Sequence, residues 1–467
     1  WGYALDNIGN RQTATRNTTN TETYTANNLN QYTEREVAGV IEVLGSANTG
    51  TTVTVNNQTA TRQGDSYWHK GLDVTNISTA VYEDTVAVGV YNPPGSNDPD
   101  VVTIESGAVF VAETPETFAN DEDGNLTGDG RWTYTWNAEN RLTEIETADA
   151  VTNVVARQKL LFQYDHMGRR VSKKVYDWST VSNDWQLASD RRLLYDGWAL
   201  ISEIVDTPTP PYAVTNYYIW SLDLSGSLQG AGGIGGLVSA ILPNPTNSLQ
   251  PTAYLYCYDA NGNVGQLVDD TGTNIVARYE YAPVGAVVVS EGELAEENRI
   301  GFSTRYFDRE TGIGKWPRRD YLPELSRWTS RDPIGEMDGP ALYCFVANNP
   351  QAYVDPLGQA GLPIDPSWPA QVLADYVGDR MAAALRNIYL CQAIRIADGS
   401  GLKRVLILSV EIPSSIAPLG GVINVHVDFV VQYTDRRGGS SDPCKSCWYH
   451  ASHEEYRSRR TSPIWRF

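Results

Sequence analysis

Apolar and polar residues alternate with a period of two in short runs along much of residues 1–358. The run at 132–136 reads Trp-Thr-Tyr-Thr-Trp. Because successive side chains of a β-strand point to opposite faces of a sheet, this period predicts strands with one buried face. Short polar turns rich in Asn, Asp and Gly separate the runs, which is typical of β-hairpins. We therefore predict a series of consecutive antiparallel hairpins.

The turns between these runs repeat one theme. An aromatic or acidic residue comes first, then a short polar turn with Gly, then Asn or Arg ahead of a β-favouring run. The theme occurs at 6–11, 121–126, 164–169 and 258–263, with related turns at 24–30, 134–142 and 195–197. A single hairpin cannot bury its own apolar face, so each hairpin is expected to stack on the next. Chance pairs of residues do not explain the theme, because turn and strand recur together.

This pattern resembles the Rhs/YD-repeat family, which includes polymorphic toxins, Tc toxin C subunits and teneurin-like proteins. The likeness is most detailed in the repeat-associated core, at 220–230, 299–308, 310–312, 323–328, 331–335 and 348–358. It covers residues 1–32 and about 118–358, and it implies a mainly β fold in which the hairpin sheet coils into a hollow shell. Residues 313–321 depart from the family pattern because they lack its run of tyrosines.

Residues 33–117 interrupt the repeat. They contain β-favouring runs at 52–56, 85–90, 101–104 and 109–111, which predict a small inserted β-sandwich. Tyr67, Trp68 and His69 could contact a ligand such as a carbohydrate, or they could belong to the core of a structural spacer. We favour the spacer, because nothing else in the segment marks an outward-facing site.

Residues 359–467 differ in character from the rest. They carry 12 Lys+Arg and 10 Asp+Glu, which gives a net charge of +2. Because the whole chain has a net charge of −20, residues 1–358 have a net charge of −22. Residues 369–390 have helical character, and 405–408 and 422–433 are expected to be strands. We predict a separate, small C-terminal α+β domain. The four predicted domains are therefore residues 1–32, 33–117, 118–358 and 359–467.

Composition and charge limit the function classes. With 36 Lys+Arg against 56 Asp+Glu, the acidic scaffold is a poor general binder of nucleic acid. No apolar run reaches the roughly 20 residues of a membrane helix. The glycine-rich run at 226–236 lacks the Lys-Ser/Thr of a phosphate-binding loop, and family context assigns it to the shell. Because the chain opens within the repeat pattern at Trp1, we expect a larger parent chain, or copies of this one, as partners.

The resemblance implies self-cleavage after the core by an aspartate-based site. One carboxylate must stay ionised to activate water while another stays protonated. Asp332 is the first candidate, with Arg331 orienting it or balancing its charge, and the second acid is Asp355 or Asp338. Alternatively, Arg331 and Asp332 form a structural ion pair at a turn. The expected cleavage site is at Gln359 and Ala360, where Gln359 replaces the leucine usual in the family.

The C-terminal domain offers one metal-ligand pattern, formed by Cys444, Cys447, His450 and His453. Two Cys and two His can bind zinc, although these four lie closer together than the ligand pairs of most zinc sites. The alternative is that they are surface residues, and we expect no other cofactor. A nuclease would use His450 or His453 as general base with Arg457, Arg459 and Arg460, and a thiol hydrolase would pair Cys391 with His426.

Two functions follow from these expectations. The first is a secreted or cell-surface bacterial protein whose repeat shell scaffolds or encloses a C-terminal, toxin-like effector. This function implies an immunity protein or a secretion machinery as further partners. The second is an extracellular structural or adhesive surface protein whose C-terminal domain is folded, uncleaved and without enzymatic activity.

Overall fold

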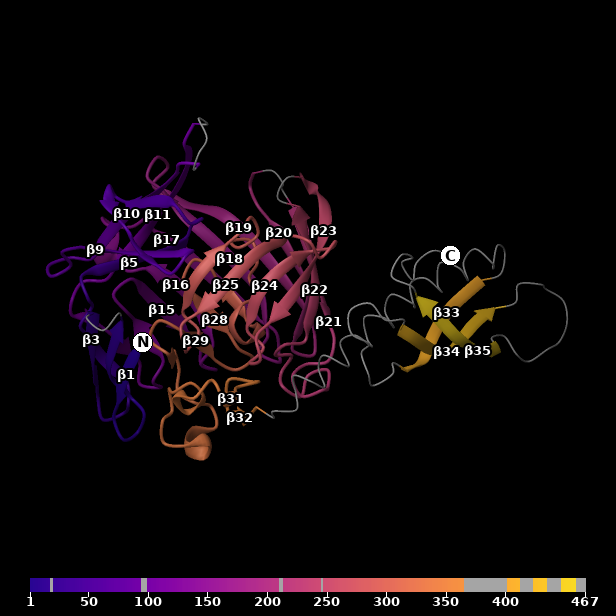
Figure 1. Ribbon diagram of the computed structural model, residues 1–467. Coiled ribbons are helices and arrows are strands. Elements are labelled where there is room, and N and C mark those ends of the chain that lie inside the picture. The colour runs from indigo at the N-terminus through magenta and orange to yellow at the C-terminus, as the bar shows by residue number, and fades with distance from the viewer. Residues whose placement is uncertain are drawn as a thin grey trace. The chain divides into compact units, whose positions relative to one another are not determined.

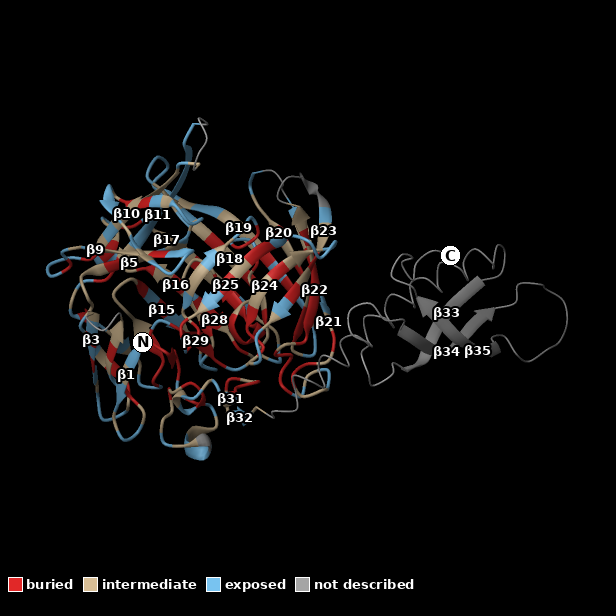
Figure 2. Cartoon of the chain, in the orientation of Figure 1, coloured by how far each residue is buried: buried red, intermediate tan, exposed pale blue. Residues whose placement is uncertain are grey.

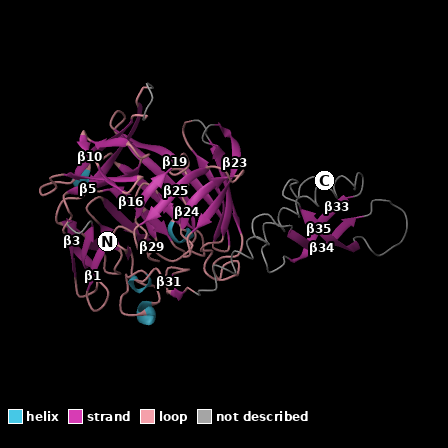
Figure 3. Ribbon diagram, viewed as in Figure 1, coloured by secondary structure: helices cyan, strands magenta, loops and turns pink. Residues whose placement is uncertain are grey.

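A computed structural model describes residues 1–16, 20–93, 99–209, 213–244, 247–364, 401–411, 423–434 and 447–458. The chain divides into two compact units, Trp1–Asp365 and Pro366–Phe467. Antiparallel strands make up almost all of the regular structure described, which confirms the mainly β fold (Figure 3). Among the described residues, the structure contains no helix that is long and apolar enough to span a membrane.

A fourteen-stranded antiparallel sheet dominates the first unit, and its strands follow one another in chain order. Figure 1 shows this sheet curling around strands that come later in the chain, such as β28 (Ile313–Lys315) and β29 (Asp320–Leu322). Its strands are β13 (Ala119–Asn120), β14 (Leu126–Gly128), β15 (Trp132–Trp136), β16 (Leu142–Thr147), β17 (Gln158–Tyr164), β18 (Arg170–Ser179), β19 (Asp184–Asp196), β20 (Ala199–Asp206), β21 (Ala213–Trp220), β22 (Leu237–Asn244), β23 (Asn247–Tyr258), β24 (Val264–Asp269), β25 (Ile275–Tyr281) and β26 (Val287–Glu291). The hairpins between residues 119 and 291 therefore form one continuous meander.

A five-stranded sheet precedes it, in the order β1 (Gly2–Leu5), β2 (Arg11–Arg16), β3 (Asn20–Ala26), β4 (Tyr32–Arg35) and β12 (Glu116–Thr117). Strands β4 and β12 lie on either side of the insert in sequence and pair antiparallel. Residues 32–35 and 116–117 thus belong to the repeat sheet, and the insert lies between them.

Two small sheets form the insert. One has the order β5 (Val40–Ser46), β9 (Tyr67–Asp73) and β8 (Thr61–Gln63); the other has the order β11 (Val101–Val111), β10 (Val81–Tyr91), β6 (Thr51–Val55) and β7 (Gln58–Thr59). Their shared core includes Ile41, Val55 and Trp68. Trp68 is buried, whereas Tyr67 is exposed and its hydroxyl accepts a 3.0 Å hydrogen bond from Arg278 of the repeat sheet. Tyr67 and Trp68 therefore do not form a common outward platform.

The recurring turn has one hydrogen-bond pattern. In the turn at Asp6, the carboxylate Oδ1 accepts the N–H groups of Ile8, Gly9 and Asn10, and Oδ2 accepts the Asn10 amide at 2.8 Å. The residue three positions after the Asp or Asn has positive φ in six such turns and is always Gly or Asn: Gly9, Asn30, Gly124, Asn140, Gly168 and Gly262. Gly and Asn tolerate this backbone region best, so the motif of the sequence is a geometric requirement.

Neighbouring turns are also bonded to each other. The amide of Asn10 donates to Asn30 Oδ1 at 2.9 Å, and Asn125 donates to Asn140 Oδ1 at 2.9 Å. Each contact links the end of one turn to the positive-φ residue of the next. The turns therefore form a hydrogen-bonded ladder along one end of the repeat sheet.

Residues 299–358 close this end and fill the inside of the curled sheet. They carry a small sheet of β27 (Tyr306–Asp308), β28 (Ile313–Lys315), β29 (Asp320–Leu322) and β30 (Arg327–Trp328), and the short 3-10 turns η2 (Phe302–Thr304), η3 (Gly335–Asp338) and η4 (Val346–Asn348). We call residues 299–358 the capping segment. It bonds directly to the turns: Asn348 donates to Gly9 O at 3.0 Å, and Tyr343 donates to Gly124 O at 2.9 Å.

The core of the capping segment is aromatic. Trp316 is fully buried, and its ring packs edge-on against Tyr321 and Trp328, each with a centroid separation of 5.3 Å. Phe345 packs against all three rings. Figure 2 shows this inner region as mostly buried. The block at 313–321 that lacks the family's tyrosines thus supplies a tryptophan at the centre of the cluster.

Buried charges join the capping segment to the repeat sheet. Arg170 of β18 lies 2.7 Å from Asp308 and 3.1 Å from Asp320, and Lys173 lies 2.8 Å from Asp308. Burial acts to raise the pKa of Asp308, but Arg170 and Lys173 outweigh it and hold this pKa well below the usual 3.8. Asp308 is therefore ionised inside the protein, held by two cations from one strand.

The described part of the second unit is a three-stranded antiparallel sheet of β33 (Gly401–Glu411), β34 (Ile423–Thr434) and β35 (Cys447–Ser458). The strands expected at 405–408 and 422–433 correspond to β33 and β34. The helix expected at 369–390 lies outside the described residues.

We expect Gly262→Ala to destabilise the first unit far more than Gly272→Ala. Both glycines have φ near +70°, so each alanine meets the same backbone penalty of about 1–2 kcal/mol. A Cβ at Gly262 would lie 2.5 Å from Ile234 Cγ2, whereas a Cβ at Gly272 meets open space. Overpacking should add about 1–3 kcal/mol at Gly262 alone. Denaturant titration of both variants measures the difference, and equal losses would contradict this packing of the turn.

Replacing Arg170 with Met should cost about 3–5 kcal/mol, because it leaves Asp308 and Asp320 buried with less compensating charge. Lys174→Met on the same strand is the control, since that side chain is 39% exposed in its ion pair with Asp190. Because the pKa of Asp308 is lowered in the folded state, its ionised form stabilises the fold above pH 3.8, and this stabilisation is lost as the pH falls further. The gap between wild type and Arg170→Met should therefore narrow as the pH falls below about 4. A gap independent of pH would show that Asp308 is not the linked group.

Candidate functional site

Two Asp-Pro-x-Gly segments of the capping segment meet at one arginine. Asp332 and Asp355 begin these segments, and both are buried. Arg319 Nη2 lies 2.8 Å from Asp332 Oδ2 and 3.5 Å from Asp355 Oδ2. The structure thus brings two of the predicted carboxylates to a single guanidinium.

Each aspartate is oriented by its own turn. Asp332 Oδ1 accepts the N–H of Ile334 at 3.0 Å. Asp355 Oδ1 accepts three consecutive N–H groups, from Leu357 at 3.2 Å, Gly358 at 2.7 Å and Gln359 at 3.0 Å. Asp side chains favour such turns because they bond the backbone two to four residues ahead. In both residues Oδ1 is bound to the turn and Oδ2 faces Arg319.

The environment gives the site a division of charge. Burial raises the pKa of Asp355 above the usual 3.8, while Arg319 and the three N–H groups act in the opposite direction. Asp332 makes the shorter of the two contacts with Arg319. Arg319 is itself buried, and its guanidinium lies 4.2 Å from the centre of the Trp328 ring. A carboxyl with a raised pKa beside an ion-paired carboxylate is an arrangement suited to acid–base chemistry.

The expected cleavage residues lie in a hairpin loop next to these acids. The loop joins β31 (Tyr353–Val354) to β32 (Leu362–Pro363), which pair antiparallel. Gln359 and Ala360 lie in this loop and are half-buried. Ile364 donates to Ala352 O at 2.8 Å, so the chain leaves the loop beside the strand by which it entered.

The remaining candidates for the acid site lie elsewhere. Arg331 is exposed and extends over the hairpin turn at Gly124, where a Cβ would lie 3.0 Å from its Nη2. The cation that the structure pairs with Asp332 is Arg319. Asp338 ends η3, and the structure describes only its backbone.

The zinc-ligand candidates of the C-terminal domain are spread along a strand. Cys447, His450 and His453 belong to β35, whereas Cys444 lies outside the described residues. An extended strand rises about 3.3 Å per residue, which spaces these three about 10 Å apart. The zinc site therefore stays a prediction. Among the residues that the structure describes, no group of three or more His, Cys, Asp or Glu side chains could hold a metal ion. Of the thiol-hydrolase pair, His426 lies on β34 and Cys391 lies outside the described residues.

Arg319 is the residue of this candidate site that the sequence patterns missed. It lies in the block at 313–321, whose departure from the family pattern drew attention only to the absent tyrosines. The sequence contains the Asp-Pro-x-Gly segment twice. Two buried carboxylates in equivalent turns indicate a cation between them, and this was the signal from which such a residue could have been expected. Nothing local in the sequence identifies which arginine supplies it.

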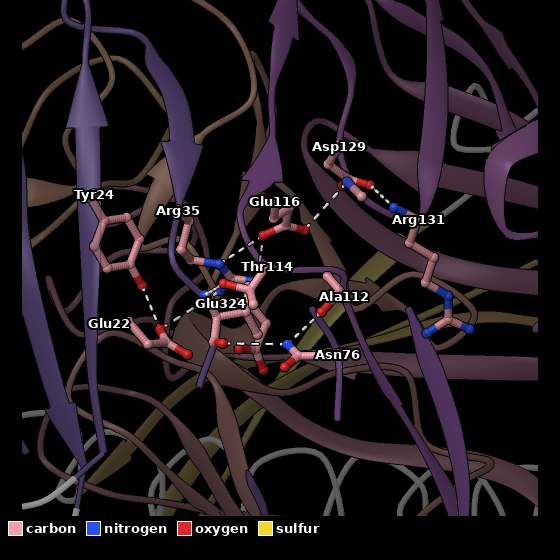
Figure 4. Close-up of polar contacts among 12 residues, drawn as sticks. Glu22, Tyr24, Arg35, Asn76, Ala112, Thr114, Glu116, Asp129, Arg131 and Glu324 are labelled. Carbon is pink, nitrogen blue, oxygen red and sulfur yellow. Dashed lines mark hydrogen bonds and ion pairs between the residues drawn. The ribbon is translucent and has the colours of Figure 1, made fainter. Parts of the chain in front are cut away.

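A second carboxylate cluster joins the repeat strands that precede the insert to those that follow it (Figure 4). Arg35 lies 2.6 Å from Glu116 and 3.9 Å from Glu22, and Tyr134 donates to Asp129 at 2.6 Å. Burial raises the pKa of Glu116 and of Asp129, and the charge of Asp129 raises that of Glu116 further. The cluster borders a cavity of about 450 Å³. Because β3 and β4 before the insert, and β12, Asp129 and β15 after it, supply these side chains, the cluster is best explained as a joint between the two parts of the repeat.

The two chain crossings at this joint are bonded as well. Asn76 is buried and donates to Ala112 O at 2.8 Å and to Val37 O at 3.3 Å. Thr114 Oγ1 accepts the N–H of Val37 at 3.0 Å. These bonds tie the entry of the insert to its exit, so the repeat sheet continues across the gap in sequence.

Three curated relatives illustrate what this chain is similar to. The tRNA3(Ser)-specific nuclease WapA of Bacillus spizizenii is 29% identical over 248 residues, which are 52% of this chain and 9% of the relative. Double-stranded DNA deaminase toxin A of Burkholderia cenocepacia is 28% identical over 256 residues, 52% of this chain and 17% of the toxin. Salivary gland surface protein 1 of Aedes aegypti is 26% identical over 165 residues, 31% of this chain and 5% of that protein. The chain thus spans a small part of each of these relatives.

Among solved structures, the TcdB2-TccC3-Cdc42 complex aligns over 76% of this chain and 17% of its own, with a TM-score of 0.40 and 18% identity. No family model matches the chain. The curated matches include Rhs-associated toxins. This likeness agrees with the repeated turn and the capping segment described above. The repeat core of this chain is thus similar to that of Rhs/YD-repeat proteins.

Proposed function

We propose that this chain is part of a secreted or cell-surface Rhs-type toxin, in which the repeat shell carries residues 360–467 as an effector and cuts them free. The names of the curated relatives support a toxin-associated protein, since they include a tRNA nuclease and a DNA deaminase toxin. In this proposal the shell is the carrier, and the toxic chemistry resides in the C-terminal domain. Further partners would be the rest of a longer parent chain, an immunity protein and a secretion machinery.

The observation that carries the proposal is the pairing of Asp332 and Asp355 at Arg319, beside the loop with Gln359 and Ala360. A hairpin loop with bound main-chain atoms is held in one geometry relative to the two acids. Fixing the reacting groups in this way removes much of the entropic cost of the reaction.

In the proposed reaction, Asp332 is the general base and Asp355 the general acid. The Asp332 carboxylate takes a proton from water, whose oxygen forms a bond to the carbonyl carbon of Gln359. The bond from that carbon to the Ala360 nitrogen breaks, and this nitrogen receives the proton of Asp355. Arg319 balances the charge of the Asp332 carboxylate at the start and that of the Asp355 carboxylate at the end. The reaction consumes one water and leaves a carboxylic acid at residue 359 and an amine at residue 360.

A second function has one specific observation in its favour. The match to a salivary gland surface protein of Aedes aegypti shows that likeness to this chain is not confined to bacterial toxins. In that alternative, the shell is a structural or adhesive scaffold with an uncleaved C-terminal domain. Arg319 and the two aspartates would then only hold the capping segment together.

We expect Asp332→Asn and Asp355→Asn each to slow self-cleavage at least 100-fold, because each removes one proton-transferring group. The full chain would be made by cell-free translation, with products followed over time by denaturing electrophoresis and intact mass. Asp270→Asn is the control. Asp270 is exposed at a distant turn, so this variant should cleave at the wild-type rate.

Intact mass should locate the new ends at residues 359 and 360. A wild-type chain that stays whole under these conditions would overturn the cleavage proposal and favour the scaffold. Cleavage that persists in both variants would instead assign the reaction to other residues.

A further inference from the structure

The main chain next to the expected cleavage site is bound carbonyl by carbonyl. Four consecutive carbonyl oxygens accept hydrogen bonds from four separate donors. Asp355 O accepts from Trp316 Nε1 at 2.9 Å, Pro356 O from Arg305 Nη2 at 2.8 Å, Leu357 O from the Arg318 N–H at 2.9 Å, and Gly358 O from Arg319 Nε. Together with the three N–H groups held by Asp355, these bonds fix the backbone of residues 355–359.

Arg305 is the most unusual of these donors. It is buried, and within the described part of the chain it forms no ion pair. Burial lowers its pKa to about 10, although Asp355 and Asp223 act against this. Its second donor, Nη1, binds Gly232 O at 2.8 Å. A buried cation is costly without a partner charge, yet this one is directed at two main-chain carbonyls.

The glycine-rich run of the sequence forms the opposite wall. Gly232 has a φ of +65°, and a Cβ there would lie 2.4 Å from Pro356 O and 2.9 Å from Arg305 Nη2. The buried carboxylate of Asp223 holds this run by accepting the N–H groups of Ala231 at 2.7 Å and Gly233 at 2.9 Å. Glycine at position 232 therefore lets the loop, the arginine and the wall approach one another.

We infer that Arg305 and Gly232 are positioning residues for cleavage, and that the site recognises the main chain of residues 355–358 and the glycine at 358, not the side chain at 359. This inference rests on the proposed self-cleavage. Gly358 has a φ of +76°, and a Cβ there would lie 3.1 Å from Trp316 Cβ. The hydrogen bond given to Gln359 is made by its backbone N–H. Glutamine in place of the family's leucine keeps every one of these contacts.

The first experiment measures cleavage rates of the full chain in cell-free translation. Arg305→Met should slow cleavage about 10-fold or more, since a small misplacement of reacting groups is costly. Arg305→Lys should fall between Met and wild type, because lysine keeps the charge but not the two-carbonyl geometry. Gly232→Ala should slow cleavage, whereas its control Gly272→Ala has open space and should not. The control for Arg305 is Arg192→Met, whose side chain is 56% exposed.

Residue 359 provides the specificity test. Gln359→Leu and Gln359→Ala should cleave within about 3-fold of wild type, whereas Gly358→Ala should cleave at least about 10-fold more slowly. Acceleration of more than 10-fold by Gln359→Leu would overturn recognition through the main chain. A wild-type rate in Arg305→Met would overturn the role of Arg305.

The second experiment does not depend on cleavage. Hydrogen exchange is compared between the uncleaved Asp332→Asn chain and the same chain carrying Arg305→Met or Gly232→Ala. The amides of residues 357–359 should exchange at least about 10-fold faster in the double variants, while those of strand β18 remain protected. Unchanged exchange at 357–359 would refute the positioning role. If the wild-type chain never cleaves but exchange is faster in the double variants, the proposed function is refuted, while the role of Arg305 and Gly232 in holding residues 355–359 is supported.

Discussion

The structure depends on one local interaction, the capture of a backbone turn by an Asp or Asn side chain. In the turn at Asp6, one carboxylate binds three successive N–H groups and the side chain four residues ahead. In the six turns that share this pattern, it closes the hairpin in a fixed register and leaves side chains such as Asn10 able to reach the next turn. Strand order, the ladder along the end of the sheet and the seat of the capping segment all follow from this geometry. The two Asp-Pro-x-Gly turns use the same capture and place an acid group at Arg319.

Charge is handled differently on the two sides of the sheet. The negative charge of residues 1–358 is mostly exposed to solvent, where it is screened. Inside, Asp308, Arg170 and Lys173 are almost wholly buried and satisfy one another. Buried ion pairs of this kind add little stability compared with apolar packing, but they penalise any misplacement of the capping segment. Specificity of placement is what a site built from residues of several turns requires.

Much of the fold was predictable because its determinants are local. The alternation of 132–136 and the positive-φ Gly or Asn of each turn can both be read within a few residues. The site was predictable only in part. Asp332 and Asp355 stand in a recognisable motif, whereas Arg319 and Arg305 reach the site through packing around Trp316, which no local pattern records. The glycines at 226–236 were visible, but their purpose depends on the position of Pro356.

The bonds between Asn348 and Gly9, and between Arg327 and Asn10, join residues more than three hundred positions apart. During synthesis from the N-terminus, each hairpin can stack on the one before it as it emerges, because its own turn contacts are local. The capping segment is made later and needs the turns already in place. Since Arg319, Asp332 and Asp355 all belong to that segment, the acid pair is assembled at the end of folding. In the proposed cleavage, the reaction would therefore wait until the capping segment is in place, without any separate regulator.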